Sequence, residues 1–174
     1  SALSTVLLSY SAPVITSVVG GVDMSTAGNE RLALLGTGFG TQELQVSGVM
    51  TVAVTYGPAP GYNLYTATGC TLSVPGTGLA VQVVCTTAEG GGSNFGVKVA
   101  VTLVVSGVAR TSPVFMNRAT LPQLGYSSPI VSSFGGTAVN ALTTGGQLVI
   151  VNGLNFGSDP APIEVHYYLT LKDA

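Results

Sequence analysis

A short corner motif, in which an apolar strand runs into Gly-x-x-Phe-Gly, occurs twice in this chain of 174 residues. Residues 32–40 and residues 148–157 each contain one copy. Glycine permits backbone conformations that other residues avoid, and an aromatic ring beside a turn packs readily into a core. The motif therefore predicts a strand that ends in a sharp corner, and it does not indicate a catalytic activity. Its residues are Gly36, Phe39, Gly40, Gly153, Phe156 and Gly157.

A second pair of matching segments makes the corner part of an internal repeat. Residues 10–17 match residues 126–133 at Tyr, Ser, Pro and the two apolar residues after Pro, with the prolines 116 positions apart (129 minus 13). The corner phenylalanines lie 117 positions apart (156 minus 39). The proline segment and the corner thus recur in the same order and at nearly the same displacement, which predicts a duplicated unit. We expect the closing strand of a preceding repeat in residues 1–10, a complete domain in 11–126 and the first half of a second domain in 127–174.

Period-two alternation of apolar residues dominates the chain between the two corners. Such alternation predicts half-buried strands, because successive side chains of a strand face opposite sides. We expect one strand within residues 44–56, a hairpin over 70–85 and a long strand over 97–105 that turns back into 108–116. No segment has the apolar spacing of an amphipathic helix, so the expected fold class is all-β, with the short, regularly spaced strands of a sandwich.

Composition excludes several functions. Only 7% of the residues are charged, and five basic against seven acidic residues give a formal net charge of -2, which leaves nothing to neutralise a row of phosphates. We therefore expect no nucleic-acid partner. The mean hydropathy is +0.54, yet no window approaches 18 uninterrupted apolar residues, so we expect no direct membrane insertion. The first ten residues carry neither an initiator Met nor a basic region, so we expect a piece of a longer product.

The chain has two cysteines, Cys70 and Cys85, and both lie on the apolar face of the predicted hairpin. Cross-strand positions of this kind make a disulfide geometrically feasible. Their spacing has no Cys-x-x-Cys form and no histidine lies near, so a metal site is not indicated. Two alternatives remain at this point, a disulfide or two buried thiols.

Four features of the chain together resemble one known family. They are the Pro-x-Ile-type openings at Pro13 and Pro129, the two corners, the cysteine pair, and a Val-x-Val strand before a closing aromatic residue. In these the chain resembles the IPT/TIG domains, immunoglobulin-like folds of plexins, growth-factor receptors, fibrocystin-like ciliary proteins, some transcription factors and starch-acting enzymes. It departs from the family in an extended region over residues 46–65 and in a second unit without cysteines.

The resemblance implies immunoglobulin-like β-sandwich repeats of the IPT/TIG type, in which the module spaces, docks or presents. It also implies a location outside the cell, which favours the disulfide between Cys70 and Cys85. Closing a loop of 15 residues (85 minus 70) stabilises a domain by about 3 kcal/mol. No catalytic residue is carried over, because the family motif contains none.

Candidate chemical groups are sparse and scattered. His166 is the single histidine, and its local partner is Glu164, so we expect a surface strand histidine rather than a catalytic or metal site. The seven carboxylates have no calcium-loop spacing. The glycine run 90–92 precedes no helix, so we expect a hairpin loop rather than a phosphate cradle. The prediction is no enzyme, no cofactor and no metal.

We therefore expect a structural and adhesive spacer of a large extracellular or cell-surface protein, suited to a filament or ciliary appendage. Its partners would be neighbouring immunoglobulin-like repeats of the same chain and other protein chains, met through strands or loops. The alternative is an accessory glycan-binding or spacer domain of a secreted carbohydrate-active enzyme, which predicts an exposed aromatic row. Tyr56, Tyr62 and Tyr65 are the candidates for that row, and the chain has no tryptophan. A Rel-like DNA-binding module is excluded by the few basic residues.

The half unit over residues 127–174 raises the question of what completes it. Half of a sandwich exposes apolar edges and is not stable alone. Either its remaining strands lie outside this sequence, or a neighbouring chain supplies them by strand addition. We expect the former.

Overall fold

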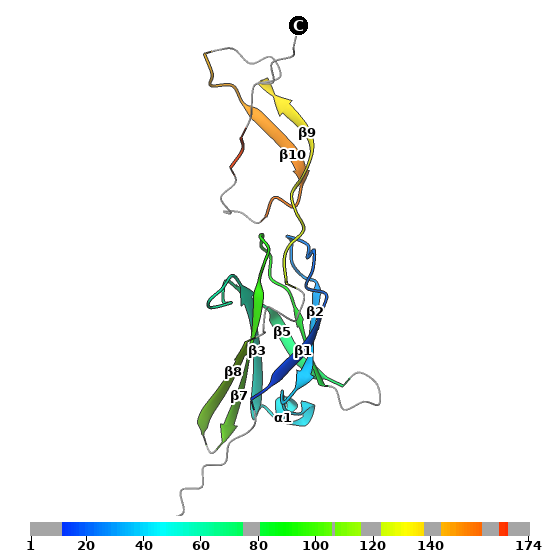
Figure 1. The fold of residues 1–174 in the computed structure, drawn as a ribbon, viewed down its shortest axis with the longest axis vertical. Coiled ribbons are helices and arrows are strands. Elements are labelled where there is room, and N and C mark those ends of the chain that lie inside the picture. Colours follow the sequence, from blue (N-terminus) through cyan, green and yellow to red (C-terminus); the bar gives the residue numbers. More distant parts are fainter. Residues whose placement is uncertain are drawn as a thin grey trace, which may run out of the picture.

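The structure is a computed structural model that describes residues 12–74, 81–105, 107–115, 123–137, 144–157 and 164–166. The regular elements of these described residues are strands of antiparallel β-sheets and one short helix (Figure 1). The expected all-β fold class is therefore confirmed. Among the described residues, no helix has the length and apolar character needed to cross a membrane. The expected closing strand in residues 1–10 and the hairpin turn at 75–78 lie outside the described residues.

The first sheet has four antiparallel strands in the order β1-β2-β6-β5. Strand β2 is central, and its Leu34 stands opposite Val18 of β1 and Val83 of β6. The predicted hairpin over residues 70–85 is the β5–β6 pair. The strands are β1 (Val14–Val19), β2 (Arg31–Thr37), β5 (Thr68–Ser73) and β6 (Val81–Thr86).

The second sheet also has four antiparallel strands, in the order β4-β3-β7-β8. Strands β3 and β7 pair along their length, from Met50 opposite Leu103 to Gly57 opposite Gly96. The long alternation over residues 97–105 forms β7, as predicted. The strands are β3 (Met50–Gly57), β4 (Tyr65–Thr66), β7 (Gly96–Val105) and β8 (Val108–Phe115).

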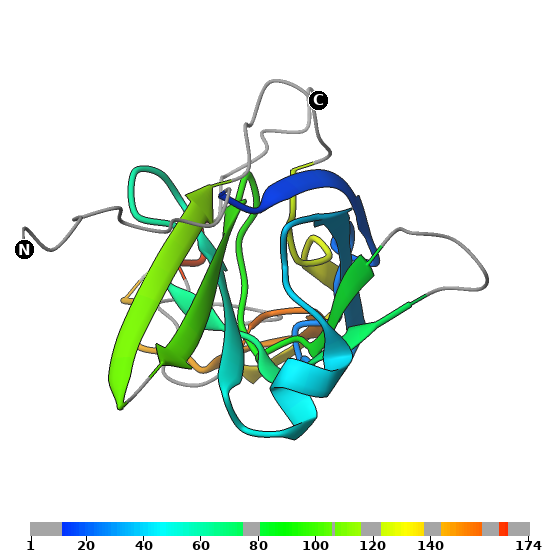
Figure 2. The same ribbon diagram turned by 90° about the horizontal axis from the view of Figure 1, so that it is seen from below.

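The two sheets face each other across a single apolar core, and we call this part of the molecule the sandwich. Figure 2, which looks along the long axis, shows the sheets on either side of that core. Each sheet contributes every second residue of its central strands, as the alternation required. Residues with almost no exposed surface include Leu32, Leu34, Phe39, Met50, Val54, Tyr56, Leu72, Val83, Val97 and Val99.

A short helix, α1 (Gln42–Val46), precedes β3 and was not expected. The strand predicted within residues 44–56 begins at Met50 instead. Thr41 caps the helix, because its side-chain oxygen accepts a hydrogen bond from the Leu44 backbone N–H at 3.4 Å. Gly48, with a φ of +75°, ends it in the left-handed conformation that favours glycine after a helix. Helix α1 lies at the end of the sandwich opposite β9 and β10 (Figure 1).

Beyond the other end of the sandwich, β9 (Ile130–Gly136) and β10 (Val149–Leu154) form a separate antiparallel pair (Figure 1). This β9–β10 pair repeats the β1–β2 pair residue by residue. Val14 stands opposite Thr37 in one pair, and Ile130 stands opposite Leu154 in the other. The remaining partners follow the same displacements of 116 and 117 positions found in the sequence.

The two pairs also share one irregularity. The register of β1 shifts between Ile15 and Ser17, so that Thr16 bulges, and the β9–β10 register skips the equivalent residue, Ser132. The hydroxyl of Thr16 donates a hydrogen bond to the carbonyl of Leu35 at 3.2 Å. The hydroxyl of Ser132 donates to the equivalent carbonyl, that of Asn152, at 3.0 Å. The match thus extends from register to hydrogen bonds.

Candidate functional site

Cys70 on β5 and Cys85 on β6 form a disulfide, as expected. Because β5 and β6 are neighbours in the first sheet, the disulfide joins two strands of one sheet rather than the two sheets. Strand β5 is the outer strand, and Gln45 of α1 covers part of its free edge. The Gln45 amide donates to the Cys70 carbonyl at 2.8 Å, and its oxygen accepts from the Leu72 backbone N–H at 2.7 Å. This edge is therefore closed to further strand pairing at that point.

The first glycine of each corner is required by a close approach of the facing strand. A Cβ on Gly36 would meet the carbonyl oxygen of Val14 and the ring of the corner phenylalanine. A Cβ on Gly153 would meet the carbonyl oxygen of Ile130 and the equivalent ring. Glycine is the residue that allows this approach, so the motif fixes how tightly each pair of strands closes.

The last glycines of the two corners have matched backbone angles, whereas the corner phenylalanines have different surroundings. Gly40 and Gly157 have φ values of +94° and +95°, where glycine is strongly favoured. The ring of Phe39 is fully buried in the core of the sandwich, whereas Phe156 is partly exposed. The corner is thus one local structure in two environments.

An aromatic cluster that sequence reasoning missed closes the end of the sandwich nearest the β9–β10 pair. Its four members are Tyr56, Tyr65, Phe95 and Tyr126, and the centroids of the closest rings, Tyr65 and Tyr126, lie 5.3 Å apart. The hydroxyls of Tyr56 and Tyr126 are 2.8 Å apart. Tyr126 donates to the Ala88 carbonyl at 2.9 Å, so Tyr56 donates to Tyr126, and the Ala88 N–H donates to Tyr56 at 2.9 Å. This closed ring of hydrogen bonds joins three distant segments.

Burial of this cluster raises the pKa of two of its tyrosines. Loss of hydration raises the pKa of Tyr126, and its hydrogen bond with Tyr56 raises it further. Loss of hydration also raises the pKa of Tyr56, although the hydrogen bonds with Tyr126 and Ala88 oppose that effect. Both hydroxyls are therefore protonated at neutral pH, as their hydrogen-bond donation to Tyr126 and to the Ala88 carbonyl requires.

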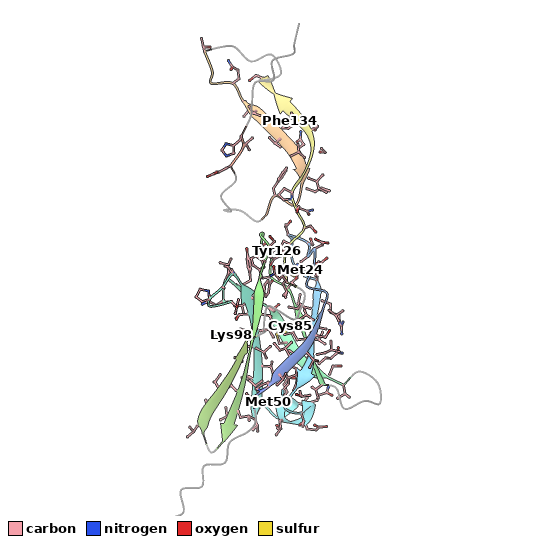
Figure 3. The ribbon with its side chains drawn as sticks, viewed as in Figure 1. Met24, Met50, Cys85, Lys98, Tyr126 and Phe134 are labelled. Carbon is pink, nitrogen blue, oxygen red and sulfur yellow. A yellow bond between two sulfur atoms is a disulfide. The ribbon has the colours of Figure 1, made fainter. Side chains whose placement is uncertain are left out.

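Residues 124–127, which we call the strap, directly precede the β9–β10 pair and are bound to the sandwich by hydrogen bonds. Leu124 and Tyr126 are 1% and 5% exposed, and Figure 3 shows Tyr126 beside Met24 at this end of the sandwich. The Ser127 hydroxyl also donates to the Asp23 carbonyl at 2.8 Å. Each strap residue donates its backbone N–H to a carbonyl of the sandwich: Leu124 to Phe95 (3.1 Å), Gly125 to Gly21 (2.9 Å), Tyr126 to Gly92 (2.8 Å) and Ser127 to Met24 (2.8 Å).

The groups considered for chemistry do not converge on a site in the part of the chain that the structure describes. His166 Nε2 lies 3.5 Å from a carboxylate oxygen of Glu164, and their side chains are 71% and 86% exposed. Residues 164–166 lie in no described strand, which differs from the strand expected there. Among the described residues, no three His, Cys, Asp or Glu side chains gather as metal ligands would.

The tyrosines proposed for an exposed glycan-binding row do not form one. Tyr56 is fully buried, and Tyr65 packs against it at a centroid distance of 5.4 Å. Tyr62 is partly buried and lies over Gly96, where a Cβ would meet its ring. Tyr56 lies in the interior because β3 directs alternate side chains inward, and alternation alone does not reveal which face of a strand a second sheet covers.

Comparisons of the chain with known family models, with curated proteins and with solved structures find no match.

Proposed function

We propose that the sandwich is an immunoglobulin-like domain of the IPT/TIG type. When strands are lettered along the chain, immunoglobulin-like folds have the order A-B-E-D in one sheet and C-F-G in the other. Here β1-β2-β6-β5 follows the first order and β3-β7-β8 follows the second, with the short β4 added beside β3. The disulfide joins neighbouring strands of one sheet, whereas antibody domains link the two sheets. The strand order, the corner and the cysteine pair support the assignment together.

The β9–β10 pair is the beginning of a second such domain. Its register, its bulge and its corner glycine reproduce those of β1 and β2. Since β1 and β2 are the first two strands of the sandwich, β9 and β10 hold the same place in the next unit. The domain limits 1–10, 11–126 and 127–174 remain predictions that this repetition supports.

The function we propose is that of a structural and adhesive spacer in a multi-repeat protein at the cell surface or outside the cell. The observation that carries it is the repetition of the β1–β2 pair in the β9–β10 pair, because successive domains on one chain set a length. The disulfide supports an oxidising location. Neighbouring domains of the same chain are the first partners, and exposed strands and loops are available to other chains.

Surface labelling of intact cells tests this proposal. Antibodies raised against the chain should label the outside of unpermeabilised cells, and electron microscopy should show the label along an extended surface structure. Peptide mapping of the native protein without reductant should recover Cys70 linked to Cys85. Label confined to the cell interior would overturn the proposal. Specific binding on a glycan array would favour the accessory domain of a carbohydrate-active enzyme instead.

A further inference from the structure

Within the glycine run 90–92, one glycine, Gly91, is not explained by the sandwich alone. A Cβ on Gly90 would meet the ring of Tyr65, and Gly92 has a φ of +99°, so both positions favour glycine for reasons within the sandwich. Gly91 has neither reason. The one described heavy atom within 4 Å of its Cβ position is the Cα of Gly157, at 3.8 Å, in the corner that follows β10.

The backbone of Gly91 is held in place from within the sandwich. The Tyr65 hydroxyl donates to the Gly91 carbonyl at 2.8 Å, and the Gly91 N–H donates to the same hydroxyl at 3.1 Å. Tyr65 in turn packs against Tyr126 of the strap, with ring centroids 5.3 Å apart. The loop that meets the corner and the segment that leads to the corner are therefore fixed by one cluster of rings.

The connection between the strap and the β9–β10 pair is too short to act as a flexible linker. Only Ser128 and Pro129 separate Ser127 from the start of β9. Proline has a fixed φ and restricts the residue before it. The Asn155 side chain of the corner donates to the Ser128 carbonyl at 3.3 Å, which ties the corner back to the connection.

We propose that the glycine run 90–92 is the seat for the Gly-x-x-Phe-Gly corner of the following domain, so that successive domains meet at a fixed angle. The partner that it fits is a backbone surface, the Cα of Gly157, a glycine held at positive φ. A Cβ on Gly91 would touch this Cα at an ordinary 3.8 Å, so a side chain larger than a methyl group would separate the loop from the corner. This inference rests on the proposed function in taking the β9–β10 pair as the start of a second domain. The junction sequence recurs upstream, where Leu8, Tyr10 and Pro13 match Leu124, Tyr126 and Pro129, and Gly40 holds the place of Gly157.

Distances between two nitroxide labels test the fixed angle on the whole chain. Val46 in α1 and Leu154 in β10 are 81% and 66% exposed, so Val46→Cys and Leu154→Cys provide label sites on the two parts. Pulsed electron–electron resonance should give one narrow distance distribution. Gly91→Leu should shift or broaden it, because the added side chain separates the loop from the corner. Ala27→Leu, an exposed position at the same end, should leave the distribution unchanged.

The thermal unfolding midpoint of each labelled variant separates a changed joint from a damaged domain. Gly91→Leu should retain the midpoint of the sandwich, because Gly91 has an ordinary φ and no sandwich atom near its Cβ position. The proposed fixed angle would be overturned by a broad distance distribution in the labelled chain without Gly91→Leu. It would also be overturned if Gly91→Leu left the distance distribution unchanged. Neither result would bear on surface labelling of cells, so failure of the joint and failure of the spacer function remain distinguishable.

Discussion

The β1–β2 pair and the β9–β10 pair have the same register, bulge and corner, yet they differ in what covers them. Leu32 of β2 is fully buried, and Val149, which holds its place in β10, is 48% exposed. Val18 of β1 packs against the core, and its counterpart Phe134 is 68% exposed. In β1 and β2 these residues face the second sheet. Figure 3 shows Phe134 on the pair that lies beyond the sandwich.

Strand pairing and burial therefore have separate origins in this molecule. The register of the pair follows from alternation, from the bulge and from a glycine that the facing strand approaches, all of which are local. Burial follows from the opposite sheet, which only the sandwich provides among the described residues. Substitutions at equivalent positions should therefore separate local from tertiary contributions to stability.

The largest difference should appear at the two corner phenylalanines. Phe39→Ala should lower the free energy of unfolding of the sandwich by about 3–5 kcal/mol, because it removes a fully buried ring. The matched Phe156→Ala should change that free energy by less than about 1 kcal/mol. Urea denaturation followed by circular dichroism measures both values. Equal losses would contradict the separation of local structure from burial.

Removal of the disulfide should affect the sandwich alone. Replacing both Cys70 and Cys85 by alanine should lower the free energy of unfolding by about 3 kcal/mol, because the unfolded chain regains the freedom of a 15-residue loop. Amide exchange in β9 and β10 should not change, since that pair has no cysteine. Reduction of the unsubstituted protein is the control, and it should shift the urea midpoint in the same direction.

The first corner glycine should matter equally in both pairs. Gly36→Ala and Gly153→Ala should each destabilise by about 1–3 kcal/mol, because a Cβ would collide with the carbonyl of Val14 or Ile130. Denaturation measures the first effect, and amide exchange in β10 measures the second. Gly135→Ala is the matched control, because its Cβ would meet Ile150 at an ordinary 3.9 Å. If only Gly36→Ala destabilised the protein, glycine would be required for packing against the second sheet and not for pairing of the two strands.

The tyrosine cluster should make the sandwich sensitive to alkali. Burial raises the pKa of Tyr126 above its unfolded value of about 10, so stabilisation is complete below that pH and falls as the pH rises above it. Tyr126→Phe should cost about 1–2 kcal/mol at pH 7, through loss of its hydrogen bonds, and should weaken the alkaline fall. Urea denaturation between pH 7 and about 11 measures both effects. An unchanged pH profile would show that Tyr126 does not contribute to it.

The smallest effects should come from the bulge hydroxyls. Thr16→Val and Ser132→Ala each remove an exposed hydrogen bond to a carbonyl of the facing strand, and each should cost about 0.5 kcal/mol. Amide exchange at the bulge is the sensitive measurement. A large loss of stability on either substitution would show that the hydroxyl, rather than the backbone, stabilises the bulge.

Several parts of this structure were predictable because they depend on neighbours in the sequence. Alternation located β7 and the β5–β6 hairpin, and it placed Cys70 and Cys85 close enough to pair. The recurrence of Pro and the Phe-Gly corner anticipated two matching strand pairs. In each case, side-chain direction in a strand alternates by geometry, so a pattern of residue types fixes a local structure.

Other features were decided only when distant segments met. Helix α1 has no periodic pattern of its own, and Gln45 anchors it on the edge of β5, a strand that lies well beyond it in the chain. Tyr56 and Tyr126 are 70 positions apart, and no pattern links them before the sheets pack. The sequence by itself determined how each strand pairs and turns. The tertiary structure decided which faces are buried, because burial requires a second surface that no single segment carries.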